Sequence, residues 1–263
     1  MVDLKGVTKI FHKGTVNERY ALNGVDLHMD DGDFVTIIGS NGAGKSTLLN
    51  AIAGVWPIDS GSIKLDGREI SHLPEHKRAP MLGRVFQDPM TGTAANMQIE
   101  ENLALAARRG KKRSLSWYID PIERADYREL LAFLDLGLED RLSAKVGLLS
   151  GGQRQALTLL MATLQKPQLL LLDEHTAALD PRTAQKVLSI TDQIVSENNL
   201  TALMVTHNMN DAIRHGNRLI MMNNGKIIYE CRGEEKLKLT VEDLMEKFAQ
   251  CGVHELSDRA LLG

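Results

Sequence analysis

An α/β fold with a helical insertion is the fold class that this sequence predicts. Short segments rich in leucine and β-branched residues, typical of buried strands in a parallel sheet, occupy residues 34–38, 168–172 and 201–206. Residues 88–165 show helical periodicity and no clear strand signal. The chain is therefore predicted to form an α/β core, residues 1–87 and 166–263, interrupted by a helical piece.

Turn and cap residues set the limits of the elements in the first part of the core. Gly54 and Pro57 end a helix that starts right after a glycine-rich loop, and Asp66-Gly67 predicts a hairpin turn. The elements predicted here are strands at 2–11, 21–29 and 34–38, a helix at 45–55, hairpin strands at 62–65 and 68–70, and a strand at 84–87.

Similar signals divide the rest of the chain. Asp180 is the expected N-cap of a helix with Pro181 at its first position, and Asn224-Gly225 predicts a second hairpin. The predicted elements are helices at 99–109, 121–136 and 153–165, a strand at 168–172, a helix at 181–198, a strand at 201–206, a helix at 208–215, and strands at 219–222 and 226–231.

Composition excludes several classes of protein. A net charge of −3 over 263 residues argues against a protein that coats nucleic acid, so we expect no nucleic-acid partner. Two cysteines, Cys231 and Cys251, are too few for a disulfide scaffold or a cysteine-rich zinc module. No apolar run approaches about 18 residues, so any membrane role is expected to come through a partner.

A glycine-rich loop follows the predicted strand at 34–38 and carries the P-loop pattern. Its residues are Gly39, Ser40, Asn41, Gly42, Ala43, Gly44, Lys45, Ser46 and Thr47. The glycines let several backbone N–H groups point at one anion, and the following helix adds its positive N-terminus. Lys45 supplies charge for the β- and γ-phosphates, and Ser46 offers a hydroxyl to Mg²⁺. The alternative, a fortuitous glycine-rich turn, does not explain the full pattern in this context.

Two acids end the apolar strand at 168–172. Beside a P-loop, Asp173 is placed to hold Mg²⁺ and Glu174 to polarise an attacking water. Alone, such a pair more often caps a helix or meets solvent.

A second glycine-rich element, Leu149-Ser150-Gly151-Gly152-Gln153-Arg154-Gln155, precedes a predicted helix. Ser150 as cap, two glycines and a helix N-terminus resemble another anion cradle. By itself the element would be an ordinary helix start.

The three motifs together, in this order, closely resemble those of the ATP-binding cassette (ABC) ATPases, and the resemblance covers nearly the whole chain. GSNGAGKST at 39–47 is similar to Walker A, LSGGQRQ at 149–155 to the family signature, and LLLLDE at 169–174 to Walker B. The resemblance implies a P-loop NTPase (RecA-like) core in residues 1–87 and 166–263, with an N-terminal antiparallel β subdomain. It also implies a helical subdomain at 88–165 within a single ABC ATPase domain.

The resemblance also implies roles for residues. Two subunits would pair head to tail, so that each ATP lies between the P-loop of one and Ser150, Gly151, Gly152 and Gln153 of the other. Glu174 would be the catalytic base, His207 would hold the γ-phosphate, and Gln87 would contact Mg²⁺ or the attacking water. Asp180 would link the two sites. Phe11 is the positional match for the aromatic residue that stacks on adenine, with Tyr20 as the alternative.

Two departures from the family pattern stand out. His175 occupies a position where proline is commoner, and Leu159-Leu160-Met161-Ala162 replaces a stretch that often carries an arginine. Neither removes a phosphate or metal ligand, so hydrolysis is still expected. The geometry after Glu174 is left open.

The resemblance implies an ATP- and Mg²⁺-dependent ATPase subunit, peripheral on the cytoplasmic face of the cell membrane. Its partners would be a second copy, transmembrane permease subunits and an extracytoplasmic solute-binding protein. Solute uptake, of amino-acid type, is the first expectation. The alternatives are an exporter or lipoprotein-release ATPase, a soluble ABC ATPase of translation or DNA maintenance, and a nucleotide-binding module without turnover.

Overall fold

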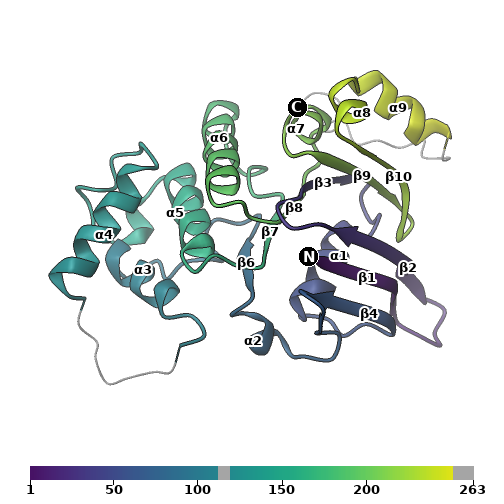
Figure 1. Cartoon of the computed structure of the whole chain (residues 1–263), viewed down its shortest axis with the longest axis horizontal. Coiled ribbons are helices and arrows are strands. Elements are labelled where there is room, and N and C mark those ends of the chain that lie inside the picture. Colours follow the sequence, from purple (N-terminus) through teal and green to yellow (C-terminus); the bar gives the residue numbers. More distant parts are fainter. Residues whose placement is uncertain (112–118, 251–263) are drawn as a thin grey trace.

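A six-stranded sheet forms the centre of the computed structural model, which describes residues 1–111 and 119–250 (Figure 1). Its strands, in sheet order, are β10 (Lys226–Arg232), β9 (Arg218–Asn223), β3 (Phe34–Gly39), β8 (Ala202–Val205), β7 (Leu169–Asp173) and β6 (Leu82–Val85). All neighbouring pairs are parallel except β10 with β9. Cys231, on β10, is a buried free thiol, and Cys251 lies outside the described residues.

The parallel register brings the chemistry to one edge of the sheet. Ile37 of β3 and Asp173 of β7 both pair with Val205 of β8. The P-loop, the acid pair and His207 therefore all follow the carboxyl ends of adjacent strands, where ligands of α/β sheets bind.

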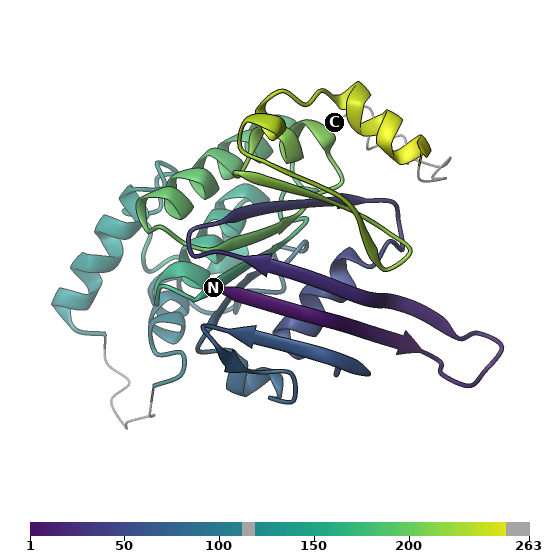
Figure 2. The ribbon, with the colours of Figure 1, turned by 45° about the vertical axis from the view of Figure 1, so that its right-hand side comes forward.

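A smaller antiparallel sheet covers the P-loop helix, as the predicted N-terminal β subdomain requires. Its order is β2 (Arg19–Met29), β1 (Val2–Phe11), β4 (Ser60–Leu65) and β5 (Arg68–Glu69). Helix α1 (Lys45–Ala53) packs in one core with this sheet and with one face of the central sheet, through side chains such as Leu48, Ile52 and Val35. Figure 2 shows the β1–β2 hairpin extending beyond the body of the molecule.

The described residues between β6 and β7 form helices joined by loops, with no strand apart from one isolated bridge between Gln98 and Lys145. They are α3 (Ile99–Ala107), α4 (Pro121–Ala132), the 3₁₀ turn η1 (Val146–Leu148) and α5 (Gly151–Thr163). Helices α5 and α6 (Pro181–Glu197) cover the other face of the central sheet, in one core with Leu170 and Leu172 of β7 (Figure 1). Helix α3 packs on α5, and α4 packs on α3 at the outer edge of the molecule. The subdomain limits at 88 and 165 stay a prediction.

Several predicted boundaries were wrong. The strand expected at 84–87 ends at Val85, which leaves Gln87 in the loop after it. The helix expected at 121–136 ends at Ala132. Helix α5 starts at Gly151 instead of Gln153 because Ser150 accepts a hydrogen bond from the Gln153 backbone and caps the helix two residues earlier.

Three helices were not predicted: α2 (Glu75–Arg78), α8 (Glu234–Leu237) and α9 (Val241–Gln250). Helix α7 (Met209–Arg214) lies within its predicted range. Leu244 and Phe248 of α9 are buried against α7, β3 and β9, so this part of the chain belongs to the fold. None of the helices in the described ranges combines the length and the apolar character that crossing a bilayer requires.

Candidate nucleotide site

The loop between β3 and α1 can form only with glycines at three positions. Gly42 and Gly44 have φ angles of 78° and 104°, in the left-handed region. A Cβ on Gly44 would lie 2.4 Å from the carbonyl oxygen of Ala21, and one on Gly39 would lie 2.4 Å from that of Met222. The close backbone approach that the P-loop pattern predicts is therefore present.

Lys45 is buried at the start of α1 with its ammonium turned back into this loop. Its Nζ donates to the carbonyl oxygens of Gly39, at 2.8 Å, and Ser40, at 3.3 Å. Burial lowers the pKa of Lys45, and the carboxylates of Glu174 and Asp173 offset part of that effect. The loop thus holds a desolvated cation whose nearest acceptors are neutral, which is a suitable environment for an incoming phosphate anion.

A cavity of about 230 Å³ opens over the loop. Its lining comprises Phe11, Arg19, Ala21, Asn41, Gly42, Ala43, Gly44, Lys45, Ser46, Thr47 and Glu174. Phe11 is fixed there by an edge-to-face contact with Trp56, at 5.0 Å between ring centroids. Tyr20, the alternative for stacking on adenine, is exposed and does not line this cavity.

Oxygen donors suited to Mg²⁺ meet beside the loop. The Ser46 hydroxyl donates to Asp173 Oδ1 at 3.3 Å, and burial raises the pKa of Asp173. No group of three or more His, Cys, Asp or Glu side chains able to hold a metal occurs among the described residues. Mg²⁺ commonly takes one or two protein oxygens and completes its octahedron with phosphates and water, so this donor pair fits that ion.

Glu174 faces His207 across the edge of the sheet. The two side chains approach to 3.6 Å between Glu174 Oε2 and His207 Nδ1. This contact with His207 holds the pKa of Glu174 below its usual value, so the carboxylate is ionised and able to accept a proton. Glu174 has a φ of 45°, an uncommon value for a residue with a side chain, and its N–H donates to Val205 at 3.0 Å.

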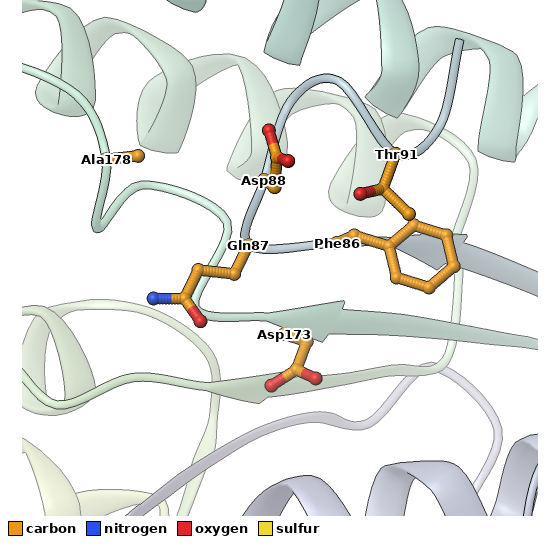
Figure 3. A pocket seen from close by; sticks show the side chains of 6 residues that line it. All are labelled: Phe86, Gln87, Asp88, Thr91, Asp173 and Ala178. Atoms are coloured by element: carbon orange, nitrogen blue, oxygen red, sulfur yellow. The ribbon is translucent and has the colours of Figure 1, made fainter.

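Gln87 and Asp173 both line a second cavity of about 420 Å³ (Figure 3). The other lining residues are Phe86, Asp88, Thr91 and Ala178. Figure 3 shows the Gln87 amide on the Asp173 side of the loop that follows β6. Gln155 of α5 donates to the Phe86 carbonyl at 3.0 Å, so the segment carrying Gln87 is tied to the helical piece.

The signature residues pack against the start of α6. Ser150 and Gln153 form a capping box at the N-terminus of α5. A Cβ on Gly152 would lie 2.0 Å from Cγ2 of Thr183, the residue whose N–H Asp180 caps at 3.1 Å. Asp180 is thus connected to the signature through Thr183. Neither it nor Ser150, Gly151, Gly152 or Gln153 lines the P-loop cavity of this same chain.

Three residues near the site were not predicted from the sequence. Arg19 donates to the Gly42 carbonyl at 2.8 Å. Arg84 of β6 donates to Asn50 at 2.7 Å and lies 4.0 Å from Asp173. His175, singled out only as a departure from a pattern, is buried, and burial lowers its pKa to about 4. No sequence signal marks Arg84, because an arginine in a short strand is ordinarily expected to reach solvent.

Comparisons with known proteins agree with this geometry. The ABC transporter family model matches residues 22–177. A tyrosine transport ATP-binding protein of Clostridioides difficile is 45% identical over 94% of this chain and 98% of its own length. A spermidine/putrescine import ATP-binding protein of Haemophilus ducreyi is 34% identical over 86% of this chain, and a methionine import ATP-binding protein of Brucella abortus is 35% identical over 88%. The chain spans 57% and 59% of the length of these last two relatives.

Solved structures agree as well. A dimeric post-hydrolysis state of the ATP-binding cassette MJ0796 bound to ADP and Pi superposes with a TM-score of 0.74 at 30% identity, covering 88% of this chain and 98% of that one. The ADP conformation of the cassette MJ1267 gives 0.78 at 27% identity, covering 95% and 98%. The predicted fold class is confirmed. The chain belongs to the ABC transporter family, and it is an ATP-binding ATPase cassette of that family.

Proposed function

We propose that this ATPase powers the uptake of a small amino-acid-type solute through separate permease subunits. The observation that carries the proposal is the 45% identity, over almost the full length of both chains, to a protein named for tyrosine transport. Two further relatives are named for import, of methionine and of spermidine or putrescine. The amino-acid class of the solute is supported by the tyrosine and methionine relatives, and the spermidine/putrescine relative does not share it.

The described residues suit ATP hydrolysis in stated roles. The P-loop amides and the Lys45 ammonium would grip the phosphates, and Phe11 would pack on the adenine. Glu174, held ionised, would take a proton from the attacking water while His207 contacts the γ-phosphate. Mg²⁺, held by Ser46 and Asp173 with Gln87 nearby, would neutralise charge developing on the phosphates.

A pair of chains would complete each site. The signature residues Ser150 to Gln153 cap the N-terminus of α5 and do not line the P-loop cavity of their own chain, so the phosphate that they would contact would be held by another chain. A two-fold pair exchanges the same surfaces and gives each P-loop the signature of its partner. The dimeric state of a cassette with 30% identity supports this arrangement.

The helical piece, residues 88–165, would dock the permease on the cytoplasmic face of the membrane. Its link to the site is the hydrogen bond from Gln155 to the Phe86 carbonyl, next to Gln87. Movement of Gln87 with the nucleotide would therefore shift the helical piece. An extracytoplasmic solute-binding protein would complete the importer.

Glu174→Gln tests the hydrolytic site. The variant should bind ATP, hydrolyse it about 10²- to 10⁴-fold more slowly, and elute as a dimer in ATP. Glu242→Gln, at an exposed position of α9, is the matched control and should behave as wild type. Undiminished turnover by Glu174→Gln would contradict the proposed base.

Reconstitution with the co-purified permease tests the solute. Proteoliposomes with ATP on the cassette side should take up an aromatic amino acid and should ignore putrescine. ATP-driven efflux, with no uptake of any amino acid, would identify an exporter and contradict the proposal.

A further inference from the structure

His175, the residue directly after the proposed base, is anchored to the middle of helix α6. Its side chain is only 2% exposed, and its Nε2 lies 3.1 Å from Thr191 Oγ1. Thr191 is itself completely buried. The pair is therefore a hydrogen bond inside the protein, where neither group has water as an alternative partner.

The direction of this hydrogen bond is fixed by a second one. Thr191 Oγ1 lies 2.8 Å from the carbonyl oxygen of Val187, which can only accept. A threonine hydroxyl has one proton, so Thr191 donates it to Val187 and must accept from His175. His175 thus carries its proton on Nε2, and the Thr191 hydroxyl is the group that receives it.

The next residue of α6 anchors the other side of the site. Asp192 Oδ2 accepts from His215 Nδ1 at 2.7 Å. His215 directly follows α7, the short helix that begins two residues after His207. Adjacent positions of one helix therefore hold the segment of Glu174 and the segment of His207.

We propose that α6 is a brace that sets the separation between the Glu174 carboxylate and the His207 imidazole. His175 and His215 are the positioning residues that connect the two segments to it. This inference rests on the proposed function, because it assumes that Glu174 and His207 act on ATP. It goes beyond that function because it gives His175, Thr191, Asp192 and His215 a role in positioning Glu174 and His207.

The geometry at Glu174 explains why such a brace matters. Its backbone has a φ of 45°, held by one hydrogen bond to Val205 and one from Ala177. Its carboxylate stands 3.6 Å from His207, slightly beyond an ordinary hydrogen bond. A displacement of a few tenths of an ångström at either segment would make or break that contact. A misplacement of about 1 Å at a reacting group can cost roughly 100-fold in rate.

Thr191→Val and Thr191→Ser form the matched pair that tests the brace. Valine keeps the shape of threonine but cannot accept from His175, whereas serine keeps the hydroxyl. We expect kcat to fall about tenfold in Thr191→Val, with the KM for ATP changed less than twofold, and to stay within twofold of wild type in Thr191→Ser. A merely structural role would lower thermal stability without this split between kcat and KM.

A second substitution tests the other contact of α6, the one between Asp192 and His215. Asp192→Ala should also lower kcat at constant KM, and because Asp192 is partly exposed it can be tested even if Thr191→Val fails to fold. Wild-type kcat in both Thr191→Val and Asp192→Ala, in a protein that Glu174→Gln inactivates, would overturn the brace and leave the proposed function intact. Turnover that survives Glu174→Gln would instead remove the proposed function itself.

Discussion

Replacing Lys45 with methionine should strongly weaken ATP binding while changing the stability of the nucleotide-free protein only slightly. Methionine has nearly the length of lysine, so the volume under the P-loop is kept while the charge is lost. The ammonium donates to two backbone carbonyls, of Gly39 and Ser40, and among residues 1–111 and 119–250 no carboxylate lies at hydrogen-bond distance from it. Its contribution to folding and its contribution to binding therefore have different sources.

The effect on the empty protein should be small. Because burial lowers the pKa of Lys45, the protonated side chain opposes folding at pH 7, and this cost disappears only above its ordinary pKa. Methionine removes that cost, but it cannot form the two hydrogen bonds, each of which contributes up to about 3 kcal/mol. Both freed carbonyls belong to half-buried residues that water can reach. The net change should be within about 1 kcal/mol, or roughly 2–4 °C in Tm.

The effect on binding should be large. A ligand at 100 times its Kd stabilises a protein by about 2.7 kcal/mol, which is roughly 5–10 °C in Tm for a chain of this size. Loss of a charged hydrogen bond to phosphate weakens Kd by roughly 100-fold. The same ligand concentration then stabilises Lys45→Met by about 0.4 kcal/mol, a shift of roughly 1–2 °C.

Thermal melting with and without a non-hydrolysable ATP analogue measures both quantities. Lys64→Met, at an exposed position of β4, is the control and should keep the full ligand-induced shift. A full shift in Lys45→Met would refute the assignment of the loop's charge to Lys45. A fall of more than about 10 °C in the empty variant would refute the argument that the ammonium contributes little to folding.

The remaining predictions concern stability and the base-binding end of the site. Arg78 is 2% exposed and donates to four backbone carbonyls, two of them in the last turn of α1. Arg78→Met should therefore lower the free energy of unfolding, measured by urea titration, by about 3 kcal/mol or more. Gly152→Ala should cost about 1–3 kcal/mol by the same measurement because its Cβ meets Cγ2 of Thr183, and Thr183→Ser, which lacks that atom, should restore most of the loss. Phe11→Ala should weaken ATP binding about tenfold in calorimetry while Tyr20→Ala leaves it unchanged, and the reverse ranking would move the stacking role to Tyr20.

Much of the fold was predictable because its signals are local. The runs of apolar residues at β3, β7 and β8 have no polar face, and only a sheet covered on both sides can bury them. Once those strands are parallel, Gly39 and Asp173 must lie at the same edge of the sheet. The motifs thus specified the place of the site as well as its chemistry.

Helix α9 was not predicted, although its apolar residues recur at helical spacing. Val241, Leu244, Met245 and Phe248 recur at helical spacing, and Leu244 and Phe248 are buried. Acidic residues stand beside this apolar stripe at Glu242, Asp243 and Glu246, so the helix is stable only where α7, β3 and β9 cover the stripe. Those packing partners lie in other parts of the chain, and the local pattern alone does not identify them.

Polar groups that act through tertiary contacts could not be placed from sequence. Arg84 sits in a short strand, where an arginine is ordinarily expected to reach solvent, yet its guanidinium lies between Asn50 and Asp173. Its burial is tolerated because an amide oxygen and a carboxylate meet there. Pattern analysis assigns faces to side chains, but it cannot identify such a pair of acceptors.

The histidine after the base illustrates the same limit with a consequence for function. In the sequence, His175 is only a departure from a pattern, and Thr191 is a polar residue in the middle of a strongly amphipathic helix. Each alone would weaken a buried position, because an unpaired polar group inside a protein is costly. Together they satisfy each other, and the hydrogen bond they form gains a fixed direction from Val187. A substitution that looks unfavourable at one position can thus be the half of a pair that holds Glu174 in place.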